Sequence, residues 1–156
     1  MSIAFPTRPT GRRIACTLLV ALAVHLGAAL ASPGDSLAAS AARGARLFDG
    51  SAPLRGRIDG HSENLPSTAS RCANCHMPSS QRAALAPPLD ATTLLAPLRR
   101  RGGPPSVYTL DSFCDALRSG VDPAHVTLKS AMPRYDASNE QCADLWASLI
   151  PTSEQP

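Results

Sequence analysis

The chain has 156 residues, with 15 basic and 12 acidic side chains and a formal net charge of +3. Arg8, Arg12 and Arg13 precede every acidic side chain, so the rest of the sequence balances 12 positive against 12 negative residues. This balance argues against a polycation that binds nucleic acid through its phosphates. Fifteen prolines, ten glycines and only six aromatic residues favour one domain with a thin core that another group completes.

The first 31 residues have the three parts of a secretory signal peptide. A cationic segment at 1–13 precedes an apolar run at 14–30, and Ala-Leu-Ala at 29–31 has the small-x-small pattern of a cleavage site. We therefore expect residues 1–31 to be removed and the protein to be periplasmic. The alternative is retention of the leader as a membrane anchor, although the apolar run is slightly short for a span.

The remaining sequence is divided by composition into three parts. Residues 32–39 are expected to be a linker rich in small residues, 40–150 the folded domain and 151–156 a tail. The first helix is expected over Ser40–Asp49, because apolar residues recur on one side and Gly50 follows the end. Glycine, proline, serine and asparagine then predict a loop as far as Ser70.

Two stronger helices close the domain. Thr109 is the expected N-cap of a helix that ends before Gly120. Ser138 begins the second helix and forms a capping box with Gln141, and Pro151 stops it. The apolar face of this helix comprises Cys142, Leu145, Trp146 and Leu149.

Between these segments the sequence predicts little regular structure. Short helical turns are expected at 72–76 and around 91–95, and no segment has the alternation that marks a strand. The domain is therefore predicted to be all-α, with about four to five short helices joined by long ordered loops.

The strongest chemical signal is Cys-Ala-Asn-Cys-His at residues 72–76. Two cysteines on one helical turn can form thioethers with the vinyl groups of a porphyrin. The imidazole that follows then lies under the iron as an axial ligand. The motif predicts one covalent c-type heme, attached through Cys72 and Cys75 and ligated by His76.

Two other chemistries use a pair of cysteines at this spacing. A redox dithiol of the thioredoxin type needs a βαβ frame, which the sequence lacks. A structural zinc site needs a second pair of ligands, and the other mature-chain cysteines, Cys114 and Cys142, are widely spaced on helices. Covalent heme is therefore the favoured interpretation.

The second axial ligand decides what the heme can do. The other candidates after the leader are Met77, Met132, His61 and His125. Met77 directly follows His76 and starts on the wrong side of the ring, so we expect it to pack rather than ligate. Met132 stands in a loop just before the last helix and is the predicted sixth ligand of the iron. Ligation by His61 is the alternative, whereas His125 is expected on a solvated loop.

With these residues the chain resembles a bacterial class I-type monoheme cytochrome c over roughly residues 43–149. Gly44 and Phe48 resemble the first helix of that family, in which a glycine permits close crossing by the C-terminal helix. The resemblance implies the cytochrome c fold, with the helices wrapped around one covalent heme. Two departures are the long segment between Phe48 and Cys72 and the presence of a single lysine, Lys129, where mitochondrial relatives have a lysine-rich docking face.

The resemblance also implies roles for residues outside the motif. Pro87-Pro88-Leu89 resembles the Pro-x-Leu of the family, so the Pro87 carbonyl should accept a hydrogen bond from Nδ1 of His76 and fix its tautomer. Arg134 is expected to neutralise a heme propionate, with a solvated arginine as the alternative. Candidates for the wall of the heme pocket are Leu89, Tyr108, Phe113, Tyr135, Leu145 and Trp146.

An iron with both axial positions filled has no open site for a substrate, which favours one-electron transfer over oxygen or peroxide chemistry. We expect an electron carrier or electron-transfer subunit rather than an enzyme. Its partners would be redox proteins such as a dehydrogenase, an oxidase or another cytochrome, and neither nucleic acid nor a membrane span is expected in the mature protein. The alternative is a heme enzyme, or a gas or redox sensor, whose methionine ligand dissociates or is absent.

Two features lie outside the heme motif. Cys114 and Cys142 stand on the two closing helices, so a disulfide between them is expected in an oxidising compartment, with two buried thiols as the alternative. The run of three arginines at 99–101 is expected to lie on a solvated loop. Its alternative role is a docking patch for an acidic redox partner.

Overall fold

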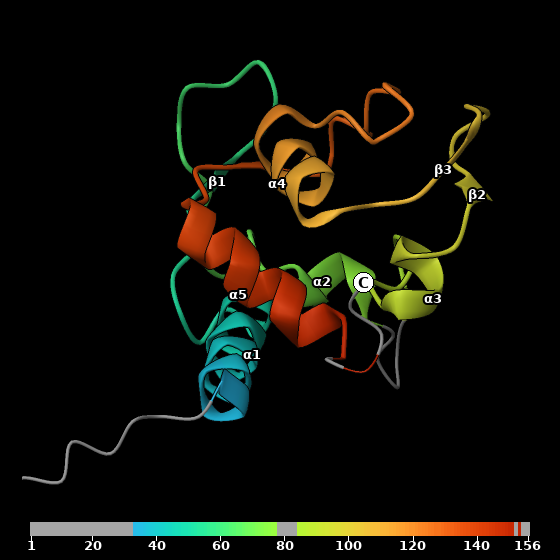
Figure 1. The fold of residues 1–156 in the computed structure, drawn as a ribbon. Helices are drawn as coiled ribbons and strands as arrows, with labels where there is room; N and C mark the ends of the chain where they lie inside the picture. Colours follow the sequence, from blue (N-terminus) through green and yellow to red (C-terminus); the bar gives the residue numbers. More distant parts are fainter. Residues whose placement is uncertain (1–32, 78–83, 152, 154–156) are drawn as a thin grey trace, which may run out of the picture. The chain divides into compact units, whose positions relative to one another are not determined.

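The computed structural model describes residues 33–77, 84–151 and 153 (Figure 1). Contacts divide the chain into Met1–Leu30 and Ala31–Pro156, and every described residue belongs to the second unit. The expected signal peptide at 1–31 therefore lies outside the described residues. No helix within the described ranges combines the length and apolarity that a membrane crossing requires.

The described residues are mostly helical, as expected, with a small amount of sheet. The helices are α1 (Pro33–Asp49), α2 (Ala73–His76), α3 (Ala91–Leu94), α4 (Leu110–Ser119) and α5 (Asn139–Leu149). The strands are β1 (Gly56–Arg57), β2 (Leu98–Arg99), β3 (Pro105–Ser106) and β4 (Arg134–Tyr135).

Helix α1 is longer than the sequence analysis predicted. It begins at Pro33, so most of the expected linker at 32–39 is helical. Proline suits the first turn because its missing N–H has no partner there in any helix, and the alanines that follow are strong helix formers. The helix ends at Asp49 as predicted, and Gly50 follows with a φ of 82°.

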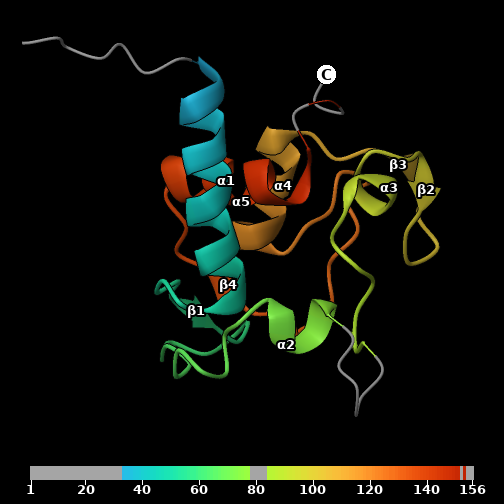
Figure 2. The ribbon, with the colours of Figure 1, turned by 90° about the horizontal axis from the view of Figure 1, so that it is seen from below.

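Helices α1 and α5 cross at close range, as both ribbon views show (Figures 1 and 2). Gly44 lies at the crossing, where an added Cβ would overlap the backbone carbonyl of Asp144. The close helix crossing expected at this glycine is therefore present. Arg43, next to it, donates two hydrogen bonds to the Asp144 carboxylate, from Nε at 2.8 Å and from Nη2 at 2.7 Å.

The two closing helices have the predicted ends. Thr109 and Ser112 form a capping box at the start of α4, and Gly120 ends this helix in the left-handed conformation with a φ of 72°. Ser138 and Gln141 form the capping box of α5. Each box satisfies backbone N–H groups that have no partner within the first turn of a helix.

The prediction that the domain has no strand is wrong. Strand β1 pairs antiparallel with β4, and β2 pairs antiparallel with β3. Each strand is two residues long, which is too short to leave the alternation of polar and apolar residues that reveals a strand in a sequence.

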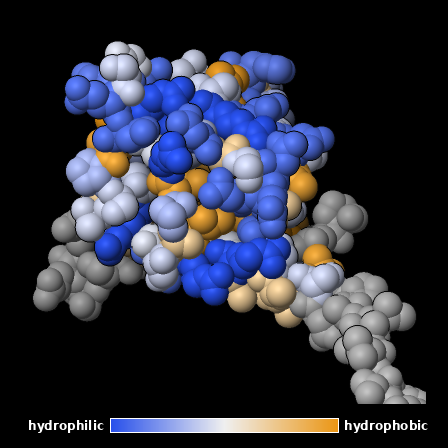
Figure 3. Space-filling model, turned by 90° about the vertical axis from the view of Figure 1, so that its left-hand side faces the viewer, coloured by the Kyte–Doolittle hydropathy of each residue, from blue (hydrophilic) through white to orange (hydrophobic). Residues whose placement is uncertain are grey.

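The core is shared by α1, α4, α5 and the segments that pack against them. Phe113 of α4 and Trp146 of α5 contact each other with ring centroids 5.5 Å apart and planes tilted by 55°, an arrangement that aromatic pairs favour. On the face drawn in Figure 3, hydrophobic side chains reach the surface at the centre and hydrophilic ones surround them. The other buried apolar residues include Leu47, Leu54, Leu94, Tyr108, Leu117, Tyr135, Leu145 and Ile150.

Candidate heme-binding site

The two motif cysteines lie on one helical turn. Cys72 has helical dihedral angles and precedes α2, and its carbonyl accepts hydrogen bonds from the N–H groups of Cys75 at 3.1 Å and His76 at 3.0 Å. The Cys72 side chain is buried, whereas Cys75 and His76 are half-buried. Burial raises the pKa of the Cys72 thiol to about 11, so the thiol stays protonated at neutral pH.

The chain returns to this turn immediately before the predicted Pro-x-Leu segment. The N–H groups of Leu85 and Ala86 both donate to the Cys75 carbonyl at 3.0 Å, which brings Pro87 against the motif. Nδ1 of His76 lies 2.6 Å from the Pro87 carbonyl oxygen. The hydrogen bond expected between these two residues is therefore present.

This hydrogen bond fixes the state of the imidazole. A carbonyl can only accept, so Nδ1 carries the hydrogen and Nε2 keeps its lone pair. Burial lowers the pKa of His76, although the Pro87 carbonyl acts in the opposite direction. His76 is therefore a neutral imidazole with Nε2 available as a ligand, the form that binds a metal.

The predicted ligand loop is tied to the motif through the strand that follows it. The hydroxyl of Tyr135, in β4, donates to the backbone carbonyl of Ser70 at 2.7 Å, two residues before Cys72. Met132 is half-buried and packs against the core, and its N–H donates to the Lys129 carbonyl at 3.0 Å. The described contacts thus bring the strand after Met132, rather than its sulfur, to the motif.

Arg134 is buried, which overturns the alternative of a solvated arginine. Its side chain is 4% exposed, and Nη1 donates to the Met132 carbonyl at 2.8 Å. Nε and Nη2 have no hydrogen-bond partner, and the nearest acid, Asp59, lies 3.5 Å from Nη2 and is 56% exposed. The guanidinium passes so close to Gly120 that any Cβ there would overlap it. The protein therefore buries a cation with two unsatisfied donor atoms beside the predicted ligand loop.

The other candidates lie in different surroundings. His61 and His125 are exposed, and His125 lies on a turn with a φ of 59°, which agrees with the solvated loop expected for it. Met77 was expected to pack, but it is 54% exposed because the backbone becomes extended at the end of α2. Leu89 is half-buried against the core, as a pocket wall requires.

The disulfide expected between Cys114 and Cys142 is absent from the described residues. Both cysteines are free thiols. Both side chains are buried, and burial together with the neighbouring Cys114 thiol raises the pKa of Cys142. The packing of α4 against α5 thus brings the cysteines together without a covalent bond, as in the alternative of two buried thiols.

The arginine run at 99–101 is not uniformly solvated. Arg99 and Arg101 are exposed, but the guanidinium of Arg100 donates to the carbonyls of Thr93 and Ser106. Arg100 also lies over the ring of Tyr108, with Cζ 4.8 Å from the ring centroid. Arg100 therefore holds the loop together. No local sequence signal distinguishes it from Arg99 and Arg101.

Ser70 and Gly56 also contribute to the site, and neither carries a sequence signal for it. Ser70 is buried, and its carbonyl receives the Tyr135 hydroxyl, but a serine in a loop carries no signal for such a contact. An added Cβ on Gly56 would lie 2.9 Å from Cε1 of Tyr135, so the glycine makes room for that ring. A long-range register between β1 and β4 creates this need, and the sequence does not reveal the register.

Two hollows of the surface contain no residue of the motif. One has a volume of about 430 Å³ and is lined by Pro53, Arg55, Asp136 and Gln141. The other is a narrow gap between the end of α1 and the loop that leads to the motif.

In the described part of the chain, no three histidine, cysteine or acidic side chains converge as a metal cluster. No family model, curated protein or solved structure matches this chain.

Proposed function

We propose that this protein is an exported class I-type cytochrome c that carries single electrons through one covalent heme. The observation that carries the proposal is the turn of Cys72, Cys75 and His76 together with the hydrogen bond from His76 to Pro87. The turn presents two thiols and one imidazole in sequence, and the hydrogen bond leaves Nε2 as the free ring nitrogen. A redox dithiol has no need for an imidazole oriented in this way. A zinc site would orient its histidine similarly, but it needs further ligands, and no three histidine, cysteine or acidic side chains converge among the described residues.

Three observations fit a heme beside this turn. The buried guanidinium of Arg134 has two donor atoms without hydrogen-bond partners, Nε and Nη2, and Nη2 has only a 3.5 Å ion pair with the exposed Asp59; a heme propionate would satisfy both donors. Leu89 and Tyr135 lie against the core on the segments that flank His76 and Met132, where a porphyrin needs apolar walls. Gly44 permits the close crossing of α1 and α5 that the cytochrome c fold requires.

Different residues would hold the heme in different ways. Cys72 and Cys75 would tether it, His76 would hold the iron from one side and Met132 from the other. Pro87 keeps the imidazole oriented, and the Met132 carbonyl is held by Nη1 of Arg134. A bound heme with both axial positions filled supplies a one-electron couple without a site for substrate.

Covalent attachment and reversible redox chemistry test this proposal together. The full gene is expressed in a host with a cytochrome c maturation system, and the purified protein is denatured and analysed by intact mass. We expect the mass of the polypeptide plus one heme, and complete cycles of reduction and oxidation without loss of absorbance. A polypeptide mass without heme, or a group that is extracted by acid and solvent, contradicts the proposal.

A further inference from the structure

The long segment between α1 and the cysteine motif forms a small hairpin. An antiparallel bridge pairs Arg57 of β1 with Asn64. The N–H of His61 donates to the Ile58 carbonyl at 3.0 Å and closes a turn between these two positions. Asp59 lies on this turn, so the hairpin determines where its carboxylate lies.

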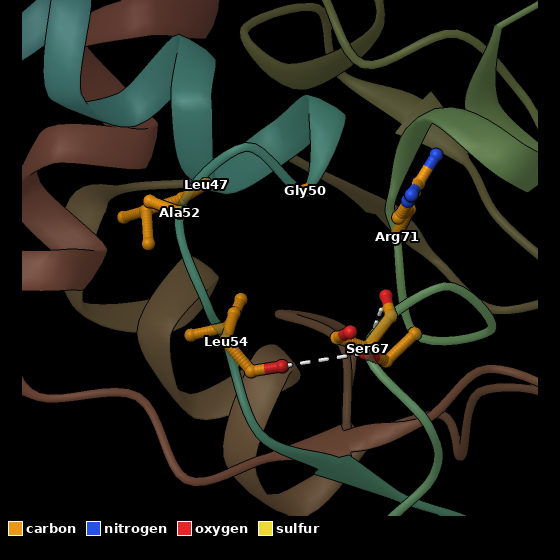
Figure 4. A pocket seen from close by; sticks show the side chains of 7 residues that line it. Leu47, Gly50, Ala52, Leu54, Ser67 and Arg71 are labelled. Atoms are coloured by element: carbon orange, nitrogen blue, oxygen red, sulfur yellow. Dashed lines mark hydrogen bonds between the residues drawn. The ribbon is translucent and has the colours of Figure 1, made fainter.

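This hairpin is held in place at two points. At its base, the hydroxyl of Ser70 donates to the carbonyls of Leu54 and Ser67, at 3.3 and 3.4 Å, shown as dashed lines in Figure 4. Along one edge, β1 pairs with β4, and the N–H of Asp136 extends this pairing by donating to the Arg55 carbonyl at 3.0 Å. The hairpin therefore has a fixed position against β4, the strand that follows the predicted ligand loop.

The guanidinium of Arg134, in β4, contacts both the hairpin and the ligand loop. Nη2 lies 3.5 Å from Oδ2 of Asp59, and Nη1 donates to the Met132 carbonyl at 2.8 Å. Among the described residues, Asp59 supplies the one ion pair of this guanidinium. Arginine has more N–H donors than these two contacts use, so Nε and a hydrogen of Nη2 are still left for a heme propionate.

The charge of Asp59 matters because a buried cation is costly without a partner. The Arg134 side chain is only 4% exposed. Gly120 leaves the space that the guanidinium occupies, since a Cβ at that position would overlap it. The guanidinium is rigid and planar, so an attraction that orients Nη2 also orients Nη1 toward the Met132 carbonyl.

We propose that Asp59 is a positioning residue for the Met132 ligand. It holds the Arg134 guanidinium in the orientation in which Nη1 binds the Met132 carbonyl, and so keeps the ligand loop closed over the heme. This inference rests on the proposed function and gives a role to the long segment that precedes the motif. Asp59 acts through Arg134 and transfers neither a proton nor an electron.

Imidazole tests this inference, because it binds the ferric iron only when Met132 has left it. Its apparent affinity therefore measures the fraction of molecules in which the ligand loop is open. Asp59→Ser removes the carboxylate and keeps a residue that turns accept. Glu63→Ser is the matched control, since it removes the same charge from an exposed position of the same hairpin. Imidazole is titrated into each ferric protein at a pH at which it is neutral, and loss of the methionine-to-iron charge-transfer band is recorded.

We expect Asp59→Ser to lower the apparent dissociation constant of imidazole about two- to five-fold, a modest change because the carboxylate is half-exposed. Glu63→Ser should resemble wild type. In an Arg134→Met background, Asp59→Ser should have no further effect, because its contact is already lost.

Two results overturn the inference while the heme and its methionine ligand stay in place. One is an equal dissociation constant for Asp59→Ser and Glu63→Ser. The other is an undiminished effect of Asp59→Ser in the Arg134→Met background. A wild-type protein that lacks heme, or lacks the methionine band, instead refutes the proposed function.

A further variant, Asp59→Glu, keeps the test decisive if Arg134→Met accumulates no protein. Glutamate restores the charge at a side chain that is 56% exposed and has room for the additional methylene group. Its dissociation constant for imidazole should therefore lie nearer to wild type than to Asp59→Ser. A value equal to that of Asp59→Ser contradicts the inference, because the charge would then have no effect on the loop.

Discussion

The proposed axial ligation by Met132 is the residue-level feature on which the proposed chemistry depends most. Replacing Met132 by alanine should abolish the methionine-to-iron charge-transfer band of the ferric protein, because no other described thioether is held toward the core near the motif. Met77→Ala is the matched control, since Met77 is 54% exposed and follows His76 directly. The absorption spectra of the two ferric variants decide the point, and loss of the band in Met77→Ala would contradict the assignment.

The buried cation Arg134 should set the reduction potential. Removing a positive charge beside the proposed heme would favour the ferric state, so Arg134→Met should lower the potential, on the order of tens of millivolts. Arg57 pairs with Arg134 in the β1–β4 register but is 39% exposed and bonded to Asp136, so Arg57→Met is the control. Potentiometric titration of both variants provides the measurement. An equal change of the reduction potential in the two variants would show that the Arg134 charge acts on the iron no more strongly than an exposed arginine.

At the scale of residues, the sequence was informative where chemistry is local. The motif and the resemblance to Pro-x-Leu were sufficient to predict the contact of His76 with Pro87. The burial of Arg134 could not be predicted, because it depends on Gly120 leaving room for the guanidinium from another segment. The contact of Tyr135 with Ser70 spans 65 residues and has no sequence signature.

At the scale of elements, the crossing of α1 and α5 organises the fold. Gly44→Ala places a methyl group on the Asp144 carbonyl, and a backbone atom cannot move aside as a flexible side chain can. The substitution should reduce the free energy of unfolding by about 1–3 kcal/mol or more. Ala45→Ser, at an exposed position of the same helix, should change it by no more than about 0.5 kcal/mol. Denaturant unfolding of both variants checks the difference, and equal midpoints would refute a close crossing.

The same crossing contains a pH-dependent ion pair. Burial pushes the pKa of Asp144 upward, but the hydrogen bonds from Arg43 and Ser40 dominate and leave the pKa below its ordinary value. The pair therefore stabilises the folded protein above the unfolded pKa of about 3.9, and this stability is lost as the pH falls through the lower folded-state pKa.

The expected result is a melting temperature of Asp144→Asn that lies below that of wild type at neutral pH, with the gap closing below about pH 4. Asp115→Asn, at an exposed position of α4, should show no such gap. Circular dichroism melts across this pH range measure it. A gap that persists unchanged in acid would mean that the carboxylate charge is not responsible.

The elements also show which signals a sequence carries. The capping boxes at Thr109 and Ser138 and the glycine at position 120 are local devices, and the boundaries of α4 and α5 follow from them. Helix α1 begins earlier than its sequence predicts, because small residues favour both linkers and helices. The β1–β4 pairing depends on tertiary contacts between distant segments, so it was invisible before the structure.

At the scale of the whole molecule, the charge and the core are explained together. The excess positive charge of the chain lies in residues 1–13, and the remaining sequence balances 12 basic against 12 acidic side chains, which argues against a polycation that binds nucleic acid. Within the arginine run, Arg100 is used to fix its own loop, which leaves Arg99 and Arg101 as the exposed charges for any acidic redox partner. A heme would complete the core that six aromatic residues leave thin.

The central claim is a covalent heme whose iron is closed on both sides by His76 and Met132. Carbon monoxide tests it most directly, because it binds ferrous iron only where an axial position is open or its ligand dissociates. We predict that the absorption spectrum of the reduced protein does not change when carbon monoxide is added, whereas reduced Met132→Ala forms an adduct at once. Rapid adduct formation by the wild-type protein would contradict the account and favour a heme enzyme or a gas sensor.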